Sequence, residues 1–164
     1  MQYTTGNGFT FTYDACDQHI VDQYAWHGRL YPKKGLIYIL AGAYLPHGRQ
    51  TKVALHRLIT GAPKGKVVDH IDGNGLNNTR ANLRVCEHWQ NMCNRGPQRN
   101  SKTGIKGVVV RNGKFRARIT RRRVKIHLGD FTTAIEAAKA YDAAVGSVHG
   151  GFGRPNLSMG RRAS

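Results

Sequence analysis

The stretch from residue 67 to residue 95 constrains the fold of this 164-residue chain more than any other part of its sequence. A short β-branched segment runs into Asp69 and His70, and a Gly/Asn-rich turn follows. A second short segment then leads into a helix-like stretch that contains Asn91 and ends at Arg95. Apolar runs this short, bounded by turn residues, are typical of small elements joined by tight turns. We therefore expect an α+β unit in which polar side chains from three successive elements meet.

Four side chains of this stretch are suited to phosphodiester chemistry at a metal ion. A hard cation such as Mg²⁺ prefers oxygen ligands and usually takes one or two of them from protein. Asp69 offers a carboxylate, and Asn91 offers an amide oxygen from a different element. His70 has a reference pKa of roughly 6.5, which suits a general base that takes a proton from water. Asn82 can accept a hydrogen bond from the other ring nitrogen of His70, which would fix the orientation of the ring.

These assignments depend on local geometry. Adjacent strand residues point to opposite faces, so Asp69 and His70 can act together only across a bulge or a turn. On the helix, His88 and Asn94 lie three residues either side of Asn91, and either can replace it as a ligand. The spacing of the acids is wrong for a calcium loop, and the histidines and cysteines lack the paired spacing of a zinc site. One Mg²⁺ (or Mn²⁺) ion per active site is the expected cofactor.

The formal net charge of +17 predicts a polyanionic partner, either nucleic acid or anionic lipid. Residues 1–66 hold 8 basic and 3 acidic residues, residues 67–99 hold 4 and 3, and residues 100–164 hold 14 and 3. The main electrostatic contact is therefore expected near the C-terminus, and the nearly neutral centre is better suited to chemistry. No apolar run approaches the roughly 20 residues of a membrane span, and the N-terminus lacks the layout of a signal peptide. We expect a cytoplasmic protein with no membrane association.

The C-terminal part of the chain predicts three antiparallel strands followed by one Ala-rich helix. Apolar and polar residues alternate along it, and Asn112-Gly113 forms a tight hairpin turn. This pattern gives a sheet with one apolar face, to which Val124, Ile126 and Leu128 belong, and one basic face. Strands can enter a groove of DNA and contact base edges. The DNA-binding residues predicted on this face and at its edges are Arg111, Lys114, Arg116, Arg118, Thr120, Arg121, Arg122, Arg123, Lys125 and His127.

The rest of the chain indicates little about function. Alternation of aromatic residues with threonines between Phe9 and Tyr13 predicts strands near the N-terminus. His56 is either a buried histidine bonded to a backbone carbonyl or a residue close to the active centre. The expected parts are a β-rich N-terminal segment (1–54), a nuclease core (55–96), a linker (97–103), a DNA-binding domain (104–157) and a tail (158–164).

Four separated blocks of this sequence resemble the HNH endonucleases of phage and intron origin. They are Leu55-His56-Arg57-Leu58, Val68 to Asn74, Asn78 to Arg84, and Asn91-Met92-Cys93-Asn94. The resemblance implies a ββα-metal fold, with a metal ligand at Asp69, the general base at His70, the orienting residue at Asn82 and a second ligand at Asn91. Asn91 stands where many of these enzymes have a third histidine, which resembles the HNN variant of some phage homing endonucleases.

The C-terminal residues resemble the AP2 DNA-binding domain. The similar segments are Gly107-Val108, Gly113-Lys114-Phe115, His127 to Thr132 and Glu136 to Ala144. The resemblance implies binding in the major groove by a three-stranded sheet with the helix packed behind it. Two positions depart from the family on the binding face: a Trp-Gly-Lys turn is reduced to Asn112-Gly113-Lys114, and an acidic position appears as Arg118. The fold carries over, but a sequence preference does not.

Together these features favour a metal-dependent DNA endonuclease of homing type. We expect a monomer that acts on double-stranded DNA without a small-molecule cofactor. The alternative is a non-catalytic, sequence-specific DNA-binding regulator that uses the AP2-like sheet. Binding of RNA would favour single strands, but the basic face offers no strong aromatic platform for stacked bases.

Overall fold

The computed structural model describes residues 1–32, 35–44 and 46–157, so the expected tail at 158–164 lies outside the described residues. The chain forms mixed α/β structure with several small sheets and few helices, as the sequence predicts in outline. It divides into two compact units, Met1–Asn91 and Met92–Ser164, which are described separately below. No helix in these ranges is long and apolar enough to cross a membrane.

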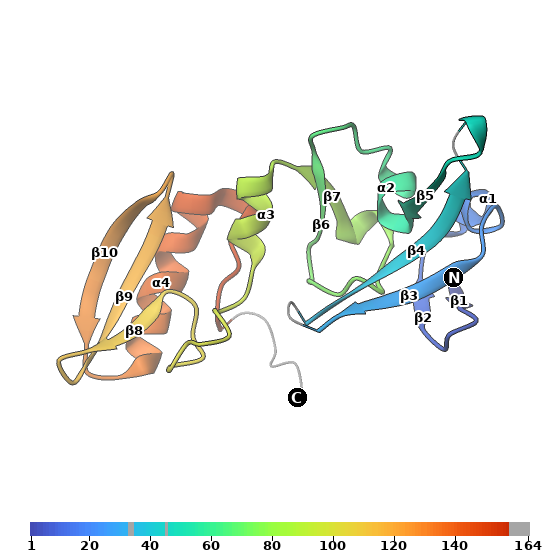
Figure 1. Cartoon of the computed structure of the whole chain (residues 1–164). Helices are drawn as coiled ribbons and strands as arrows, with labels where there is room; N and C mark the ends of the chain where they lie inside the picture. Colours follow the sequence, from blue (N-terminus) through green and yellow to red (C-terminus); the bar gives the residue numbers. More distant parts are fainter. Residues whose placement is uncertain (33–34, 45, 158–164) are drawn as a thin grey trace. The chain divides into compact units, whose positions relative to one another are not determined.

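The first unit contains three small antiparallel sheets, with strand orders β1-β2, β3-β4-β5 and β6-β7 (Figure 1). Its strands are β1 (Gln2–Thr4), β2 (Thr10–Thr12), β3 (Trp26–Tyr31), β4 (Leu36–Tyr44), β5 (Gln50–Ala54), β6 (Val67–His70) and β7 (Leu83–Cys86). Its α-helices are α1 (Gln18–Val21), α2 (Leu55–Thr60) and the first residues of α3 (His88–Asn94), and short 3₁₀ turns lie at Ala15–Asp17, Pro46–Gly48 and Arg80–Asn82.

One hydrophobic core joins the N-terminal strands to the segment around Asp69. Phe11 and Trp26 from the N-terminal part pack in the same cluster as Leu55, Val68 and Leu83. Each of these side chains is buried, and burying a large apolar side chain contributes about 1.5–3 kcal/mol. The β-rich N-terminal segment is thus part of the body that carries Asp69 and His70.

The same N-terminal strands also hold the loop that follows β6. The Thr12 backbone N–H donates to the Leu76 carbonyl at 2.9 Å, and the Asn78 N–H donates to the Thr12 carbonyl at 2.8 Å. A Cβ atom on Gly75 would lie 1.8 Å from the carbonyl oxygen of Ile37, so only glycine allows the loop to approach β4 this closely. The loop is therefore fixed from two sides by residues distant in sequence.

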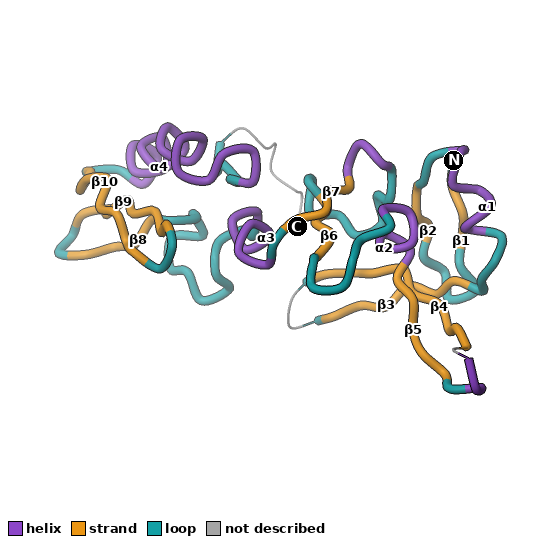
Figure 2. Tube along the Cα trace, turned by 90° about the horizontal axis from the view of Figure 1, so that it is seen from above, coloured by secondary structure: helices purple, strands orange, loops and turns teal. Residues whose placement is uncertain are grey.

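The second unit has one three-stranded antiparallel sheet, in the order β10-β9-β8, and one long helix. Seen from above in Figure 2, α4 lies on one side of this sheet. Its elements are the end of α3, β8 (Val108–Arg111), β9 (Lys114–Arg121), β10 (Val124–Phe131), α4 (Ala134–His149) and a 3₁₀ turn at Gly150–Phe152. The three strands and the helix lie where the sequence predicts them.

Local chemistry explains the turns and the start of α4. Asn112 and Gly113 both have positive φ, at 50° and 72°, as a two-residue hairpin turn of this type requires. Arg122 and Arg123 also have positive φ at the next turn, although neither residue favours that conformation. The Thr133 side chain accepts from the Glu136 N–H, and Glu136 accepts from the Thr133 N–H, which forms a complete capping box.

The core of this unit lies between the sheet and α4. Ala117 and Ile119 on β9 are buried against the helix, with Tyr141 and Val145 on its facing side. Leu128 packs there as predicted, but Val124 and Ile126 are 65 % and 37 % exposed. Ile126 lies opposite the buried Ile119, and Val124 shares its face two residues earlier, so both are on the apolar face as predicted. They are exposed because they lie near the tip of the hairpin, beside the arginine turn.

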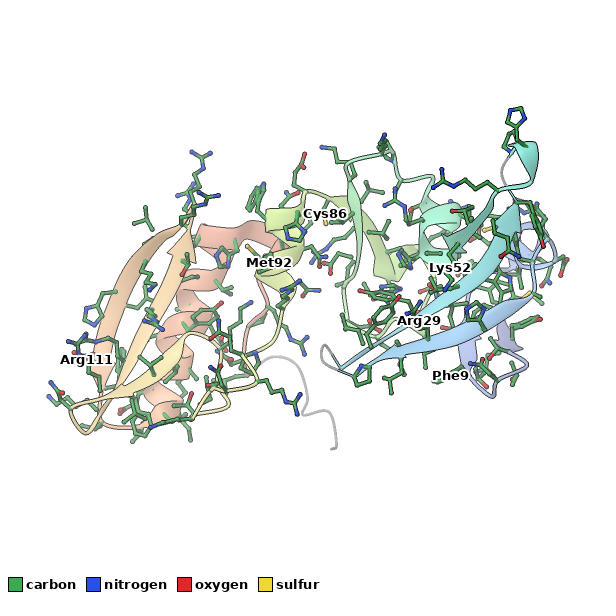
Figure 3. All side chains as sticks on the ribbon, in the orientation of Figure 1. Phe9, Arg29, Lys52, Cys86, Met92 and Arg111 are labelled. Carbon is green, nitrogen blue, oxygen red and sulfur yellow. The ribbon has the colours of Figure 1, made fainter. Side chains whose placement is uncertain are left out.

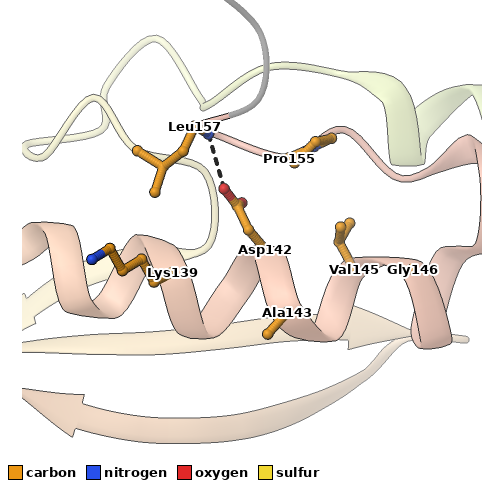
Figure 4. A pocket seen from close by; sticks show the side chains of 7 residues that line it. All are labelled: Lys139, Asp142, Ala143, Val145, Gly146, Pro155 and Leu157. Atoms are coloured by element: carbon orange, nitrogen blue, oxygen red, sulfur yellow. Dashed lines mark hydrogen bonds between the residues drawn. The ribbon is translucent and has the colours of Figure 1, made fainter.

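The chain after α4 returns along the outer side of the helix. The carboxylate of Asp142 accepts hydrogen bonds from the backbone N–H groups of Asn156 and Leu157, at 2.7 and 2.8 Å. Figure 4 shows the bond to Leu157 beside a shallow hollow of about 580 Å³. Asp142 therefore anchors the last described residues to α4.

Candidate active site

The strand β6 places Asp69 and His70 at its end. Both residues are 5 % exposed, and β6 pairs with β7 without a break in register from Val67↔Cys86 to His70↔Leu83. The two side chains therefore leave the strand on opposite faces. The irregularity expected between them lies directly after His70, where the Gly73 N–H donates to the His70 carbonyl at 2.8 Å and closes a turn.

Asp69 is paired with a cation from the neighbouring strand. Arg84 lies directly opposite Asp69 in the β6–β7 pairing and donates from Nε and Nη2 to Oδ2, at 2.9 and 2.6 Å. Their side chains are only 6 % and 18 % exposed, for Asp69 and Arg84 respectively. An ion pair this deeply buried depends on both partners, because removal of one leaves the other without compensation for its lost solvation.

The ring of His70 lies in a cluster of polar and aromatic side chains. Its Nε2 lies 3.3 Å from Oδ1 of Asn78, which is itself fully buried. The ring of His56 meets the His70 ring edge-on with centroids 5.2 Å apart, and the ring of Tyr38 lies 6.2 Å away. Burial lowers the pKa of His70 below 6.5, although Asn78, Asp72 and Asp69 oppose this shift. Most of the His70 imidazole is therefore neutral at neutral pH.

The hydrogen bonds of the Asn82 side chain go to the loop after β6 and not to the ring of His70, which the sequence predicted it to orient. Oδ1 of Asn82 accepts from the Asp72 N–H at 3.0 Å, and Nδ2 donates to Oδ1 of Asp72 and to the Asn77 carbonyl, at 3.0 and 2.8 Å. Asn82 therefore holds the loop that follows His70, whereas Asn78 is the partner at Nε2 of the ring. Sequence reasoning missed Asn78, and the only signal was its place in a run of asparagines.

His56 is a buried neighbour of His70. Its Nδ1 has no hydrogen-bond partner among the described residues, so a bond from this atom to a backbone carbonyl is not what fixes the ring. Burial, with His70 and Arg57 as smaller contributions, lowers the pKa of His56 to about 3. His56 is thus a neutral side chain beside the candidate base, which corresponds to the second of the two positions considered from the sequence.

Asn91 lies in the middle of α3 and is half-buried. Its backbone N–H donates to the Glu87 carbonyl at 3.1 Å. Of the two alternatives on this helix, His88 is exposed and Asn94 is buried. The role of Asn91 as a metal ligand remains a prediction, because no contact in the structure tests it.

The donor set fits a hard cation with few protein ligands. Asp69 and Asn91 both offer oxygen atoms, and a carboxylate with one amide oxygen is a donor set that Mg²⁺ accepts. Among the described residues, no group of three His, Cys, Asp or Glu side chains could hold a metal ion.

The predicted DNA-binding residues gather on the face of the β8–β10 sheet opposite α4 and at its edges. Arg111, labelled in Figure 3, ends β8. Across β9 and β10, Arg118 pairs with His127, and Thr120 pairs with Lys125. A hollow of about 370 Å³ on this face is lined by Val109, Val110, Arg111, Arg116, Arg118, Lys125 and His127. The sequence did not place Asp130 here, yet its carboxylate contacts both Arg116 and His127.

A family model and a viral relative identify the same family. A family model described as HNH endonuclease matches residues 53–93. A protein of Acanthamoeba polyphaga mimivirus, described as an uncharacterized HNH endonuclease, is 30 % identical over 154 residues, which cover 90 % of this chain and 75 % of that protein. Protein 3.8 of Escherichia phage T7 is 41 % identical over 46 residues, which cover 28 % of this chain and 38 % of that protein. No solved structure matches the chain.

Proposed function

The chain belongs to the HNH endonuclease family and is a DNA nuclease, and from this premise we propose that it hydrolyses phosphodiester bonds of double-stranded DNA with His70 as its general base. HNH endonucleases generally depend on a divalent metal. The observation that carries the proposal is the environment of His70: its ring is buried at the end of β6, directly after Asp69 in sequence, and its Nε2 lies 3.3 Å from Oδ1 of Asn78. A histidine fixed in this way presents one defined nitrogen to its substrate.

The environment of His70 supports its role as a base. When Nε2 carries the proton that is donated to Asn78, the lone pair lies on Nδ1. Burial keeps the ring neutral, which is the form that accepts a proton from water. General-base catalysis of this kind contributes about 10²- to 10⁴-fold to a reaction rate.

Asp69 and Asn91 are the residues that would hold the metal ion, with Mg²⁺ (or Mn²⁺) as the expected cation. When bound, the ion supplies stabilisation of the charge that develops on the leaving oxygen. The ion pair with Arg84 fixes the direction of the Asp69 carboxylate. Asn82 holds the loop after His70 through Asp72 and Asn77, so that the loop keeps one conformation beside the base.

The second unit supplies the main DNA-binding surface in this proposal. Its sheet exposes arginine and lysine side chains on the face that α4 does not cover, and such a face attracts phosphates. We assign to it the AP2-like mode of major-groove binding, and to β6, β7 and α3 the ββα-metal arrangement. A monomeric homing endonuclease is the type of enzyme that combines these two functions.

Incubation of supercoiled plasmid with Mg²⁺ tests the proposal. The wild-type protein should convert plasmid to open-circular or linear DNA, and the ratio of these products measures nicking against double-strand cutting. The variant His70→Ala should be slower by about 10²- to 10⁴-fold. His19→Ala, which alters an exposed histidine in α1, is the matched control and should cut as the wild type does.

Two outcomes would contradict the proposal. Equal cleavage by His70→Ala and the wild type would remove His70 from the reaction. Tight binding of duplex DNA without cleavage under Mg²⁺ or Mn²⁺ would instead favour the non-catalytic regulator.

A further inference from the structure

A β-bulge places an acidic residue on the basic face of the β8–β10 sheet. The pairing of β10 with β9 runs regularly to His127↔Arg118 and then shifts, so that Gly129 lies opposite Ala117. The extra residue, Leu128, reverses the alternation of the strand beyond it. Asp130 therefore lies opposite Arg116, on the same face as His127 and away from α4.

Asp130 holds Arg116 by two hydrogen bonds. Nε of Arg116 donates to Oδ1 at 2.6 Å, and Nη2 donates to Oδ2 at 2.7 Å. These bonds use one edge of the guanidinium group and two of its five N–H donors. The other edge, formed by Nη1 and the second N–H of Nη2, still carries two parallel N–H groups that can make a bidentate contact to O6 and N7 of guanine.

The pairing is unfavourable for a residue that merely binds phosphate. Asp130 adds a negative charge to a face that otherwise attracts a polyanion, and it partly neutralises Arg116. In return it restricts a long side chain that is 29 % exposed and would otherwise have several rotamers. Asp130 thus fixes the direction of the Arg116 side chain but neutralises part of its charge. This exchange favours a contact to a base edge over a contact to phosphate, because a base contact depends on geometry.

We propose that Arg116, oriented by Asp130, recognises a guanine base in the major groove and gives this nuclease a sequence preference. This inference rests on the proposed function, because it takes duplex DNA as the ligand of the β8–β10 face. Arg116 lines the hollow of that face together with Arg118, Lys125 and His127. Arg118 and Lys125 are exposed and act mainly as neighbouring phosphate contacts.

Selection of bound sequences from a random duplex library, with the full-length protein and EDTA to prevent cleavage, tests this inference. The wild-type protein should enrich sites that share a fixed guanine. Replacement of that guanine by 7-deazaguanine, which lacks the N7 acceptor, should weaken binding by about 10- to 100-fold. Arg116→Lys keeps the charge but loses the planar fork that makes two parallel bonds, so its preference for guanine over adenine at this position should be clearly smaller than that of the wild type.

Two further variants distinguish recognition of guanine from electrostatic attraction to any DNA duplex. Asp130→Asn should reduce the guanine preference and at the same time strengthen binding to random duplexes, because it removes a negative charge. Lys125→Ala, as a matched control, should weaken binding to all duplexes by a similar factor and leave their ranking unchanged.

An absence of any guanine preference in the wild type, or an undiminished guanine preference in Arg116→Lys, would overturn the inference. These results are independent of the plasmid assay. A protein that cuts plasmid without preferring guanine contradicts only the role of Arg116. A protein that prefers guanine but cuts under no metal contradicts only the proposed reaction.

Discussion

The two units of this protein use polar residues in opposite ways. The first unit buries Asp17, His56, Asp69, His70, Asn78 and Asn82, and among the described residues of the second unit only Asn94 is a buried polar side chain. The C-terminal part instead carries most of its charge outside, with 14 basic residues against 3 acidic ones from residue 100 onward. Its sheet–helix core is made of residues such as Val108, Ile119 and Tyr141.

The proposed function gives a physical reason for this difference, because it assigns a different task to each unit. A general base needs fixed, poorly solvated neighbours, because their direction and charge act strongly where water is excluded. Attraction to DNA needs accessible cations, because its strength comes from the release of counterions. Substitutions in the first unit should therefore affect stability and rate, whereas those on the basic face should affect affinity and its dependence on salt.

The largest expected effect comes from the buried ion pair in the first unit. Arg84→Ala leaves the carboxylate of Asp69 buried without its partner, and such a loss costs about 3–5 kcal/mol. Lys66→Ala removes an exposed pair with Glu87 and should cost less than about 1 kcal/mol. Urea denaturation of both variants measures the difference. Equal losses would show that burial does not distinguish the two pairs.

A smaller effect is expected from the titration of His56. The unfolded chain takes up a proton on this residue near pH 6.5, whereas the folded protein does so only near pH 3, because burial lowers the pKa. Between these values the unfolded state binds more protons, so stability falls as the pH falls. From pH 7 to pH 5 this residue should cost about 2 kcal/mol.

Denaturant unfolding of the wild type and of His56→Gln at both pH values isolates this contribution. The variant cannot take up a proton at position 56, so its stability should change less over the same range. An identical pH dependence in the two proteins would show that His56 is not kept neutral by the fold.

The next effect concerns the positioning of His70. Asn78→Ala removes the partner at Nε2 and should lower kcat for plasmid cleavage by about tenfold, since loss of an orienting partner typically costs 10- to 100-fold. Asn74→Ala alters an exposed asparagine of the same loop, whose contacts go to Asp72 and Leu76, and serves as the control. Circular dichroism must show both variants folded. A larger loss in Asn74→Ala would assign the effect to the loop and not to the ring.

The smallest effect belongs to single cations on the basic face. Arg118→Ala should reduce the slope of log affinity against log salt by about one unit, and over a fourfold change in salt this amounts to roughly a three- to fourfold difference. Arg29→Ala removes an exposed arginine of the first unit, which stacks over Tyr31, and should leave the slope as it is. If the salt dependence of affinity had the same slope in both variants, the phosphate contacts would not be confined to the second unit.

Much of the fold could be predicted from the sequence, because its signals are local. The alternation from Phe115 to Thr120 and the positive-φ turn at Asn112-Gly113 define a hairpin within a few residues. The mixed α/β character and the membership of the HNH endonucleases also follow from short-range motifs around Asp69 and His70.

The details of the site depended on contacts between distant segments. His56 lies 14 positions before His70, and only the packing of α2 against β6 brings their rings together. Thr12 holds the loop at Leu76 and Asn78 across more than sixty positions of sequence. No periodicity records such contacts, because they form only when the two segments share one core.

The sequence by itself determined which side chains could do chemistry and which strands carry the basic charge. The tertiary structure alone decided which asparagine contacts the ring of His70, and that Asp130 lies beside Arg116. Alternation predicts the face of a residue only while the register is unbroken, and the single extra residue at Leu128 reverses it for Asp130. The order of residue types along the strand does not show this extra residue, yet the extra residue moves the Asp130 carboxylate from one face of the sheet to the other.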